Sequence, residues 1–213
     1  MIVADNESTD RTAEIARSRG CEVVPVEKRA IAAVRNGGAR AARGDVVAFV
    51  DADIQIHPET FNEIDRVLAS GRVIGGTTGI RMERSSIGLT CTCALLSVMG
   101  ALIRLALRTM PALHVDTGVV FCLRRDFERV GGYNEERFFI EDVQLLVDLI
   151  RLGRSRGQRL AAWMNAEAVF STRKFDVYGD WHYFTAPLRL PWSALYRASS
   201  MNGFVRRYWY EAR

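Results

Sequence analysis

The chain lacks the cysteine and histidine patterns that mark several common classes of site. Its four cysteines form no C-x-x-C pair, so neither a zinc site nor a thioredoxin-type redox motif is indicated. Cys91 and Cys93 lie in an apolar run, and we expect them to be buried free thiols. The three histidines are scattered along the chain, which favours structural roles over a metal centre.

The chain also has little net charge and no biased segments. A formal net charge of +4, without a dense basic patch interleaved with aromatic residues, argues against nucleic acid as a partner. The 48% hydrophobic and 25% charged residues are ordinary for a globular protein. At 213 residues we expect one domain with at most a small appendage.

No leader resembling a signal peptide opens the chain, so we expect a reducing cytoplasmic setting. The longest run without charge is 85–103, close to the roughly 20 apolar residues of a membrane span. Polar residues and glycines dilute it, and a crossing there would separate Asp53 from Asp142. We therefore expect a buried helix or one that lies on a membrane surface.

Segments with the pattern of a strand alternate with segments that have the pattern of a helix, and this alternation predicts an α/β fold. Strands are predicted at 2–4, 22–26, 46–50, 72–80, 119–123, 160–164 and 168–170, and helices at 12–17, 31–43, 58–68, 124–130 and 141–152. After 172 the composition becomes aromatic and basic. We expect a domain over 1–172 and a helical tail over 173–213, which either covers the active site or faces a membrane.

The predicted strand at 46–50 reads as fully buried, and two carboxylates, Asp51 and Asp53, follow it directly. In an open α/β sheet, ligands bind at the carboxyl ends of the strands. Carboxylates this close repel each other unless a cation lies between them. Oxygen ligands suit Mg²⁺ or Mn²⁺, although a solvated turn would also place aspartates here.

Further motifs follow in a fixed order, at 5–10, 35–38, 41–45, 116–118, 131–135 and 141–142. Together with Asp51 and Asp53 this series resembles family 2 of the nucleotide-sugar-dependent glycosyltransferases, from residue 2 to about residue 165. The resemblance implies a GT-A fold, an open mixed sheet flanked by helices. It also implies that the chain starts at the family's second strand, because no counterpart of the first strand precedes Ile2.

On the side of the sugar donor, the resemblance implies that Asp51 and Asp53 bind Mg²⁺ or Mn²⁺ and the nucleotide diphosphate. Asp5 and Asn6 match a pair that contacts the nucleotide, with Asn6 where many relatives have Asp. Arg35 matches a position near the diphosphate, where a guanidinium suits phosphate oxygens. A solvated helix face is the alternative for Arg35.

On the acceptor side, the resemblance makes Asp142 the general base. Asp116, Thr117, Gly118 and Glu141 then line the acceptor, and Gly118 would let a ligand approach the backbone closely. A base at a helix N-terminus is held in its charged form. N-terminal capping alone is the alternative for Asp142.

The resemblance thus implies an inverting, metal-dependent glycosyltransferase that moves a sugar from a nucleotide diphosphate to a hydroxyl acceptor. The apolar run and the tail favour a lipid-linked acceptor, such as a polyprenyl phosphate or a glycolipid, at the inner face of a membrane. The absence of a Gln-x-x-Arg-Trp motif argues against a polymerising synthase. The rival readings are a non-catalytic binding or scaffold protein and a nucleotidyltransferase.

Overall fold

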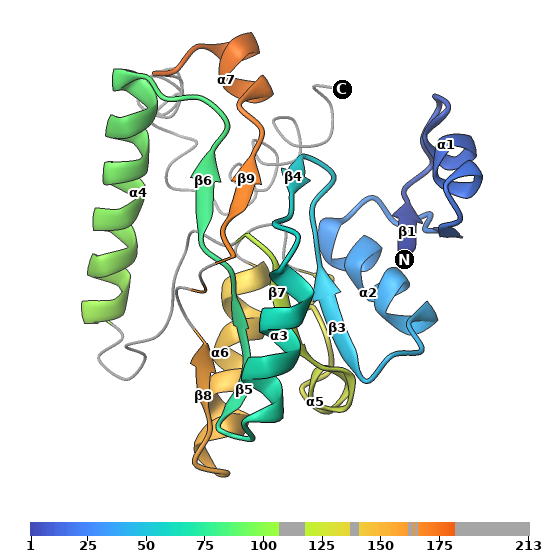
Figure 1. The fold of residues 1–213 in the computed structure, drawn as a ribbon, viewed down its shortest axis with the longest axis vertical. Helices are drawn as coiled ribbons and strands as arrows, with labels where there is room; N and C mark the ends of the chain where they lie inside the picture. The colour runs from blue at the N-terminus through green and yellow to red at the C-terminus, as the bar shows by residue number, and fades with distance from the viewer. Residues whose placement is uncertain (107–117, 137–140, 162–163, 165, 182–213) are drawn as a thin grey trace.

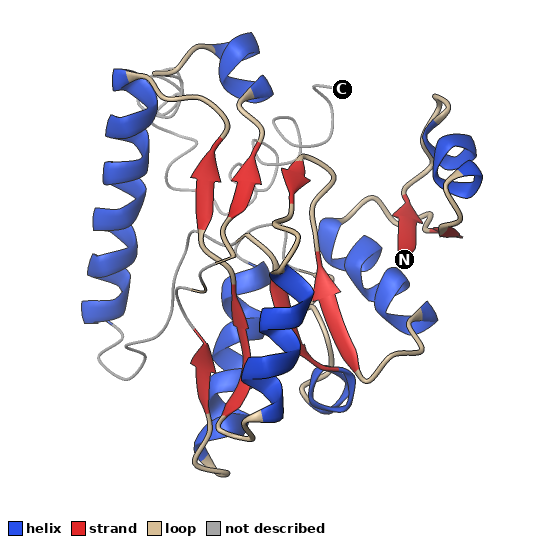
Figure 2. Cartoon of the chain, viewed as in Figure 1, coloured by secondary structure: helices blue, strands red, loops and turns tan. Residues whose placement is uncertain are grey.

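A computed structural model describes residues 1–106, 118–136, 141–161, 164 and 166–181. Strands and helices alternate through these residues, and helices flank the sheets (Figures 1 and 2). The predicted α/β class is therefore confirmed. The described strands form three small sheets in place of one continuous sheet, of which one is parallel and two are mixed.

The first unit contains β1 (Ile2–Asp5), α1 (Thr12–Ser18), β2 (Glu22–Pro25) and α2 (Ile31–Ala41). β1 and β2 pair in parallel as a two-stranded sheet. Figure 1 shows this pair at one side of the molecule, with α2 between it and β3 (Val46–Phe49).

The central sheet has the order β3-β7-β5-β8, with β5 at Val73–Thr77, β7 at Val120–Leu123 and β8 at Arg159–Ala161. β7 runs antiparallel to both β3 and β5, and β8 runs parallel to β5. Helix α3 (Thr60–Ala69) lies in front of this sheet and α6 (Glu141–Arg154) behind it (Figure 2).

The side chains of β7 explain how both helices are held. Phe121 packs in one core cluster with Ile64 and Leu68 of α3. Its neighbours Val120 and Cys122 pack in another cluster, with Leu145 and Leu149 of α6 among others. Because successive strand residues point to opposite faces, one apolar run supplies both cores.

The third sheet has the order β4-β9-β6, with β4 at Ile54–Gln55, β6 at Ile80–Met82 and β9 at Ala168–Phe170. Two helices accompany it: α4 (Ile87–Ala106) and α7 (Arg173–Tyr178). The short helix α5 (Arg124–Arg129) follows β7 directly.

Two details of the predicted burial are wrong. The strand at 46–50 is not fully buried: of its residues only Val47 is, and Val50 is 40% exposed. The reason is that β3 is an edge strand of the central sheet. Cys91 and Cys93, which the apolar run predicts to be buried, are only partly buried on α4.

The uncharged run forms most of α4, as predicted, but the helix is not buried throughout. Leu89 is buried, whereas Ile87 is 79% and Val98 is 58% exposed. Within the described part of the chain, no helix has both the length and the apolar character needed to cross a membrane.

Candidate functional site

Arg35 is the centre of the charged cluster at the carboxyl end of β3. Its Nη2 donates a hydrogen bond to Asp51 Oδ1 at 2.7 Å, and its Nη1 donates to Asp142 Oδ1 at 2.7 Å. Glu141 Oε1 lies 3.5 Å from the same Nη1. The Arg35 side chain is only 12% exposed. One buried guanidinium thus joins α2, the end of β3 and the start of α6.

Tyr133 supports this cluster from below the guanidinium. Its hydroxyl donates to Asp142 Oδ1 at 3.0 Å, and Arg35 Cζ lies 5.3 Å from its ring centroid. The rings of Phe49 and Phe127 pack against it at centroid distances of 5.0 and 5.8 Å. Tyr133 therefore fixes the position of Asp142 through packing as well as through a hydrogen bond.

Asn36, next to Arg35 on α2, anchors the loop that carries Tyr133. Its Oδ1 accepts from Tyr133 N and its Nδ2 donates to Tyr133 O, both at 2.9 Å. Gly132 makes this approach possible: its φ is +70°, and a Cβ there would come within 2.8 Å of Asn36 Oδ1. The glycine pair before Tyr133 is thus explained by the geometry of the loop.

The electrostatics of the cluster keep Arg35 charged and Tyr133 neutral. Burial alone would lower the pKa of Arg35, but Tyr133, Asp142 and Asp51 together raise it above its ordinary value. Burial, and then the charge of Asp142, raises the pKa of Tyr133 well above its ordinary value. Burial also raises the pKa of Glu141, with Asp142 adding to the effect and Arg35 opposing it.

Asp51 and Asp53 lie at the carboxyl end of β3, where the sequence predicts a metal site. The Asp51 side chain is 49% exposed and keeps contact with Arg35, while the Asp53 carbonyl accepts from Ser171 N at 3.0 Å. No group of three or more acidic, histidine or cysteine side chains that could hold a metal occurs among the described residues. Two carboxylates still suit Mg²⁺ or Mn²⁺, which are commonly held by one or two carboxylates together with phosphate oxygens.

Asp5 is the last residue of β1 and Asn6 follows it, and both are engaged in local structure. Asp5 Oδ1 accepts from Ser8 N at 3.3 Å. Asn6 Nδ2 donates to the carbonyls of Val26 and Lys28, at 2.6 and 3.3 Å. Within the described ranges no hydrogen bond or ion pair joins either residue to the Arg35 cluster. Their predicted contact with a nucleotide stays a prediction.

Of the predicted acceptor side, Asp116 and Thr117 lie outside the described residues. Gly118 is tightly packed: a Cβ there would come within 2.5 Å of Thr78 Oγ1 and 2.9 Å of Ile80 Cγ2. The atoms that closely approach the backbone of Gly118 therefore belong to side chains of the protein itself. Glu141 joins the Arg35 cluster, and the acceptor role of these residues stays a prediction.

Sequence reasoning did not assign roles to Tyr133 and Asn36. Both stand inside motifs used for the resemblance, immediately after the glycine pair and immediately after Arg35. Their adjacency to those motifs was the available signal. This adjacency could not show that Asn36 and Tyr133, which are 97 positions apart in the sequence, exchange two hydrogen bonds.

Comparisons with solved structures found the same fold in glycosyltransferases. Glucosyl-3-phosphoglycerate synthase from Mycobacterium tuberculosis, in complex with Mn²⁺, UDP and phosphoglyceric acid, matches with a TM-score of 0.60 and 22% identity, over 91% of this chain and 69% of that one. Mannosyltransferase PcManGT from Pyrobaculum calidifontis, in complex with GDP-Man and Mn²⁺, matches with a TM-score of 0.52 and 17% identity, over 96% and 58%. S. aureus TarS in complex with UDP matches with a TM-score of 0.54 and 15% identity, over 97% and 62%.

The chain is short beside some of these proteins. It spans 54% of a mycobacterial protein of 24% identity and 57% of the synthase bound to UDP-glucose and glycerol 3-phosphate. A comparison of the sequence with curated proteins gave no match. The sequence profile described as glycosyl transferase family 2 matches residues 1–131, which is more than half of the 213 residues. The chain therefore belongs to glycosyl transferase family 2.

Proposed function

We propose that this protein transfers a sugar from a nucleotide diphosphate to an acceptor hydroxyl, with inversion and with Asp142 as the general base. The observation that carries the proposal is the Arg35 bridge, which joins Asp51 to Asp142 through two hydrogen bonds of 2.7 Å. The carboxylates of Asp51, after the end of β3, and of Asp142, at the start of α6, are therefore held by the same guanidinium.

The proposed chemistry needs a cation near the departing diphosphate and a base near the acceptor. Arg35 provides a charged guanidinium whose fork suits phosphate oxygens. When a diphosphate accepts hydrogen bonds from Arg35, the guanidinium is drawn from Asp142. That carboxylate is then able to take the proton of an acceptor hydroxyl.

Asp51 and Asp53 would hold Mg²⁺ or Mn²⁺, which would neutralise charge that develops on the leaving diphosphate. The oxygen donor set supports this assignment, and two structures of the same fold contain Mn²⁺. Asp53 lies two residues beyond Asp51, in the turn that follows β3, which supports a shared role of the two carboxylates.

A lipid-linked acceptor is supported by the surface of α4. Ile87, Leu95 and Val98 are 79%, 42% and 58% exposed. At about 100° per residue these three positions fall within one stripe of the helix. An apolar stripe of this kind suits contact with lipid. The proposed place of the protein is the cytoplasmic face of a membrane, where a polyprenyl phosphate or a glycolipid would be available.

The test of the enzymatic role measures release of nucleoside diphosphate from UDP- and GDP-sugars with Mn²⁺. Asp142→Asn is expected to bind UDP or GDP like the parent protein but to lose about 10²–10⁴-fold in rate. The matched control is Asp148→Asn on the same helix, where the carboxylate pairs with Arg151, and its rate should stay within a few-fold. Equal rates for Asp142→Asn and the parent would reject Asp142 as the base. Nucleotide binding without turnover of any sugar donor would favour a binding module.

The lipid contact is tested by flotation with phosphatidylglycerol vesicles. Ile87→Ser combined with Val98→Ser should reduce the bound fraction. The control Phe61→Ser also removes a half-exposed apolar side chain, but from α3, and should leave binding unchanged. If the double variant and the control variant both bind the vesicles like the parent protein, the apolar stripe of α4 does not support a lipid contact.

A further inference from the structure

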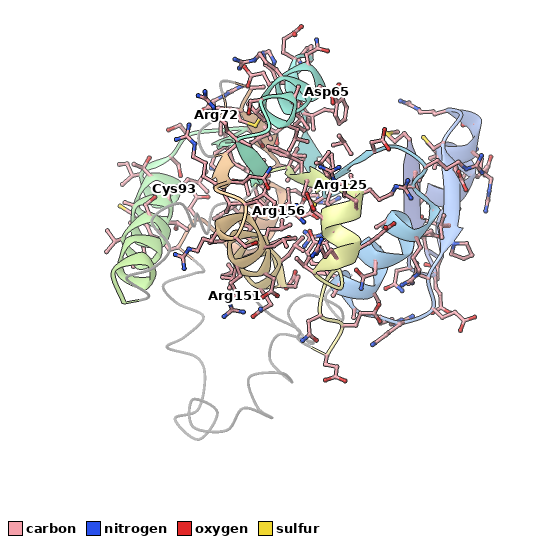
Figure 3. All side chains as sticks on the ribbon, turned by 90° about the horizontal axis from the view of Figure 1, so that it is seen from below. Asp65, Arg72, Cys93, Arg125, Arg151 and Arg156 are labelled. Atoms are coloured by element: carbon pink, nitrogen blue, oxygen red, sulfur yellow. The ribbon has the colours of Figure 1, made fainter. Side chains whose placement is uncertain are left out.

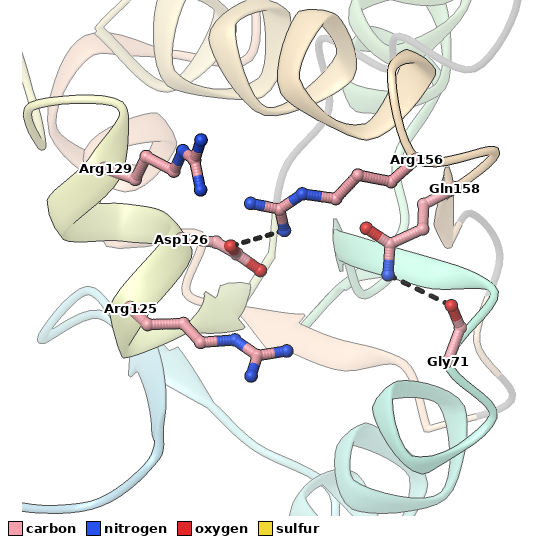
Figure 4. Close-up of a pocket in the computed structure, with 6 residues that line it drawn as sticks. All are labelled: Gly71, Arg125, Asp126, Arg129, Arg156 and Gln158. Carbon is pink, nitrogen blue, oxygen red and sulfur yellow. Dashed lines mark hydrogen bonds and ion pairs between the residues drawn. The ribbon is translucent and has the colours of Figure 1, made fainter.

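A solvent-open pocket of about 480 Å³ lies at the end of the central sheet where β5 begins and β7 ends, opposite to Asp51. The strand register places it there: Val46, at the start of β3, pairs with Leu123, at the end of β7. Helix α5 and the start of β5 therefore lie at the end of the sheet that is remote from the Arg35 cluster. Figure 4 shows the residues that line this distal cavity: Gly71, Arg125, Asp126, Arg129, Arg156 and Gln158.

Three guanidinium groups face one another across the distal cavity. Arg125 and Arg129 extend from α5, and Arg156 extends from the turn after α6 (Figure 4). Arg156 Nη1 lies 2.7 Å from Asp126 Oδ1, so this pair is neutral. Neither Arg125 nor Arg129 has an ion pair with any residue that the structure describes. Arg125 and Arg156 both lie on the side of the molecule that Figure 3 shows.

Two buried oxygen atoms at the distal cavity have no hydrogen-bond partner among the described residues. Asp126 is only 1% exposed, and its Oδ2 accepts no bond from any residue that the structure describes. Gln158 donates its Nε2 to Gly71 O at 3.0 Å, but its Oε1 is likewise buried without a donor. Buried polar atoms are nearly always hydrogen-bonded, so both oxygens need a donor that the described part of the chain does not provide.

We propose that the distal cavity binds a small phosphate monoester that carries hydroxyl groups. Arg125 and Arg129 together supply two positive charges, which match the charge of a phosphate monoester near pH 7. Both oxygens are covered in this structure, and small rotations of the two side chains bring them to hydroxyl groups of the same ligand, which then donate to Asp126 Oδ2 and Gln158 Oε1. The cavity volume lies within the range of about 300–1,000 Å³ usual for small-molecule sites.

The arrangement selects against other anions. A bare inorganic phosphate satisfies the two arginines but offers few donors to the buried oxygens. A neutral polyol offers the donors but leaves Arg125 and Arg129 without a counter-charge. A ligand with both groups is therefore bound more tightly than either part, because each buried group gains a partner.

Calorimetry on the full chain, with ribose 5-phosphate and inorganic phosphate as probes, tests this proposal. Replacing both Arg125 and Arg129 by Gln should raise the Kd for ribose 5-phosphate at least about tenfold, which corresponds to about 1.4 kcal/mol. The control replaces Arg66 and Arg151 by Gln. Both are well exposed, at 70% and 64%, and lie outside the cavity. The Kd of this control variant for ribose 5-phosphate should stay within about twofold of the parent value. Such a result would show that binding depends on Arg125 and Arg129 and not on the net charge of the protein.

Two further variants locate the ligand. Gln158→Met should reduce the preference for ribose 5-phosphate over inorganic phosphate, because it removes an acceptor and keeps the size. Asp53→Ala, at the other edge of the sheet, should leave the Kd unchanged. Equal weakening in the two double variants, no binding of either probe, or loss of binding in Asp53→Ala would overturn the proposal. Should the cavity variant fail to fold, Arg129→Gln alone gives the same comparison.

Discussion

Arg35 and Asp142 are 107 positions apart in the sequence and are joined by a hydrogen bond of 2.7 Å. The same guanidinium reaches Asp51 at the end of β3 with an equal distance. A single side chain of α2 therefore ties together the two carboxylates that the proposed reaction needs. Several expectations follow from the geometry around this residue and from the packing of the central sheet.

Arg35→Lys is expected to weaken UDP binding at least about tenfold, because an ammonium cannot bridge Asp51 and Asp142 with a planar fork. The free energy of unfolding should fall by about 1–3 kcal/mol, since half-buried carboxylates lose a charged partner. Calorimetry and urea unfolding measure the two effects. Arg40→Lys on the same helix is 69% exposed and should change stability by less than about 0.5 kcal/mol. Equal behaviour of the two variants would show that the bridge contributes nothing.

Asp53→Ala is expected to abolish the effect of Mn²⁺ on the affinity for UDP or GDP while the melting temperature stays near that of the parent. Asp53 stands in the turn after β3, and its carboxylate makes no hydrogen bond or ion pair with any described residue. Titration of nucleotide with and without Mn²⁺ measures the effect. Asp65→Ala, on the exposed side of α3, is the matched control (Figure 3). A persistent Mn²⁺ effect in Asp53→Ala would place the metal elsewhere.

Glu141→Gln is expected to gain stability relative to the parent protein as the pH rises. Burial raises the pKa of Glu141 in the folded state above its ordinary value. The neutral acid therefore contributes fully below the unfolded pKa, near pH 4, and this contribution is lost as the pH rises through the folded pKa. Urea unfolding of both proteins between about pH 4 and pH 7 measures the difference. A difference that is constant with pH would contradict the shift.

Gly76→Ala is expected to destabilise the protein by about 1–3 kcal/mol, the usual cost of overpacking a core. A Cβ at this position of β5 would come within 2.5 Å of Ala161 O and 2.8 Å of Ala161 Cβ on the neighbouring β8. Gly38→Ala in α2 should instead stabilise by up to about 1 kcal/mol. Its nearest neighbour, Ala4 Cβ, is at an ordinary 3.5 Å. Thermal unfolding of the two variants checks the opposite signs.

The sequence by itself determined the elements and the ends of the elements at which the candidate residues stand. Hydrophobic periodicity and turn residues act over a few neighbouring positions, so they can be read locally. The run before Asp51, the start of α6 at Glu141 and the glycine pair before Tyr133 were all apparent in this way. The family resemblance was apparent for the same reason, because it depends on the order of short motifs.

Only the tertiary structure decided which elements are neighbours. Among the described strands, β3 pairs only with β7, about 75 residues away in sequence, and is therefore an edge strand. No pattern within residues 46–49 specifies how many neighbours this strand has. The same holds for Asn36 with Tyr133 and for the distal cavity, where Arg125, Arg156 and Gly71 come from three separate segments. Such contacts form only when packing of the core brings distant segments together, and the pattern of any one segment does not specify its partner.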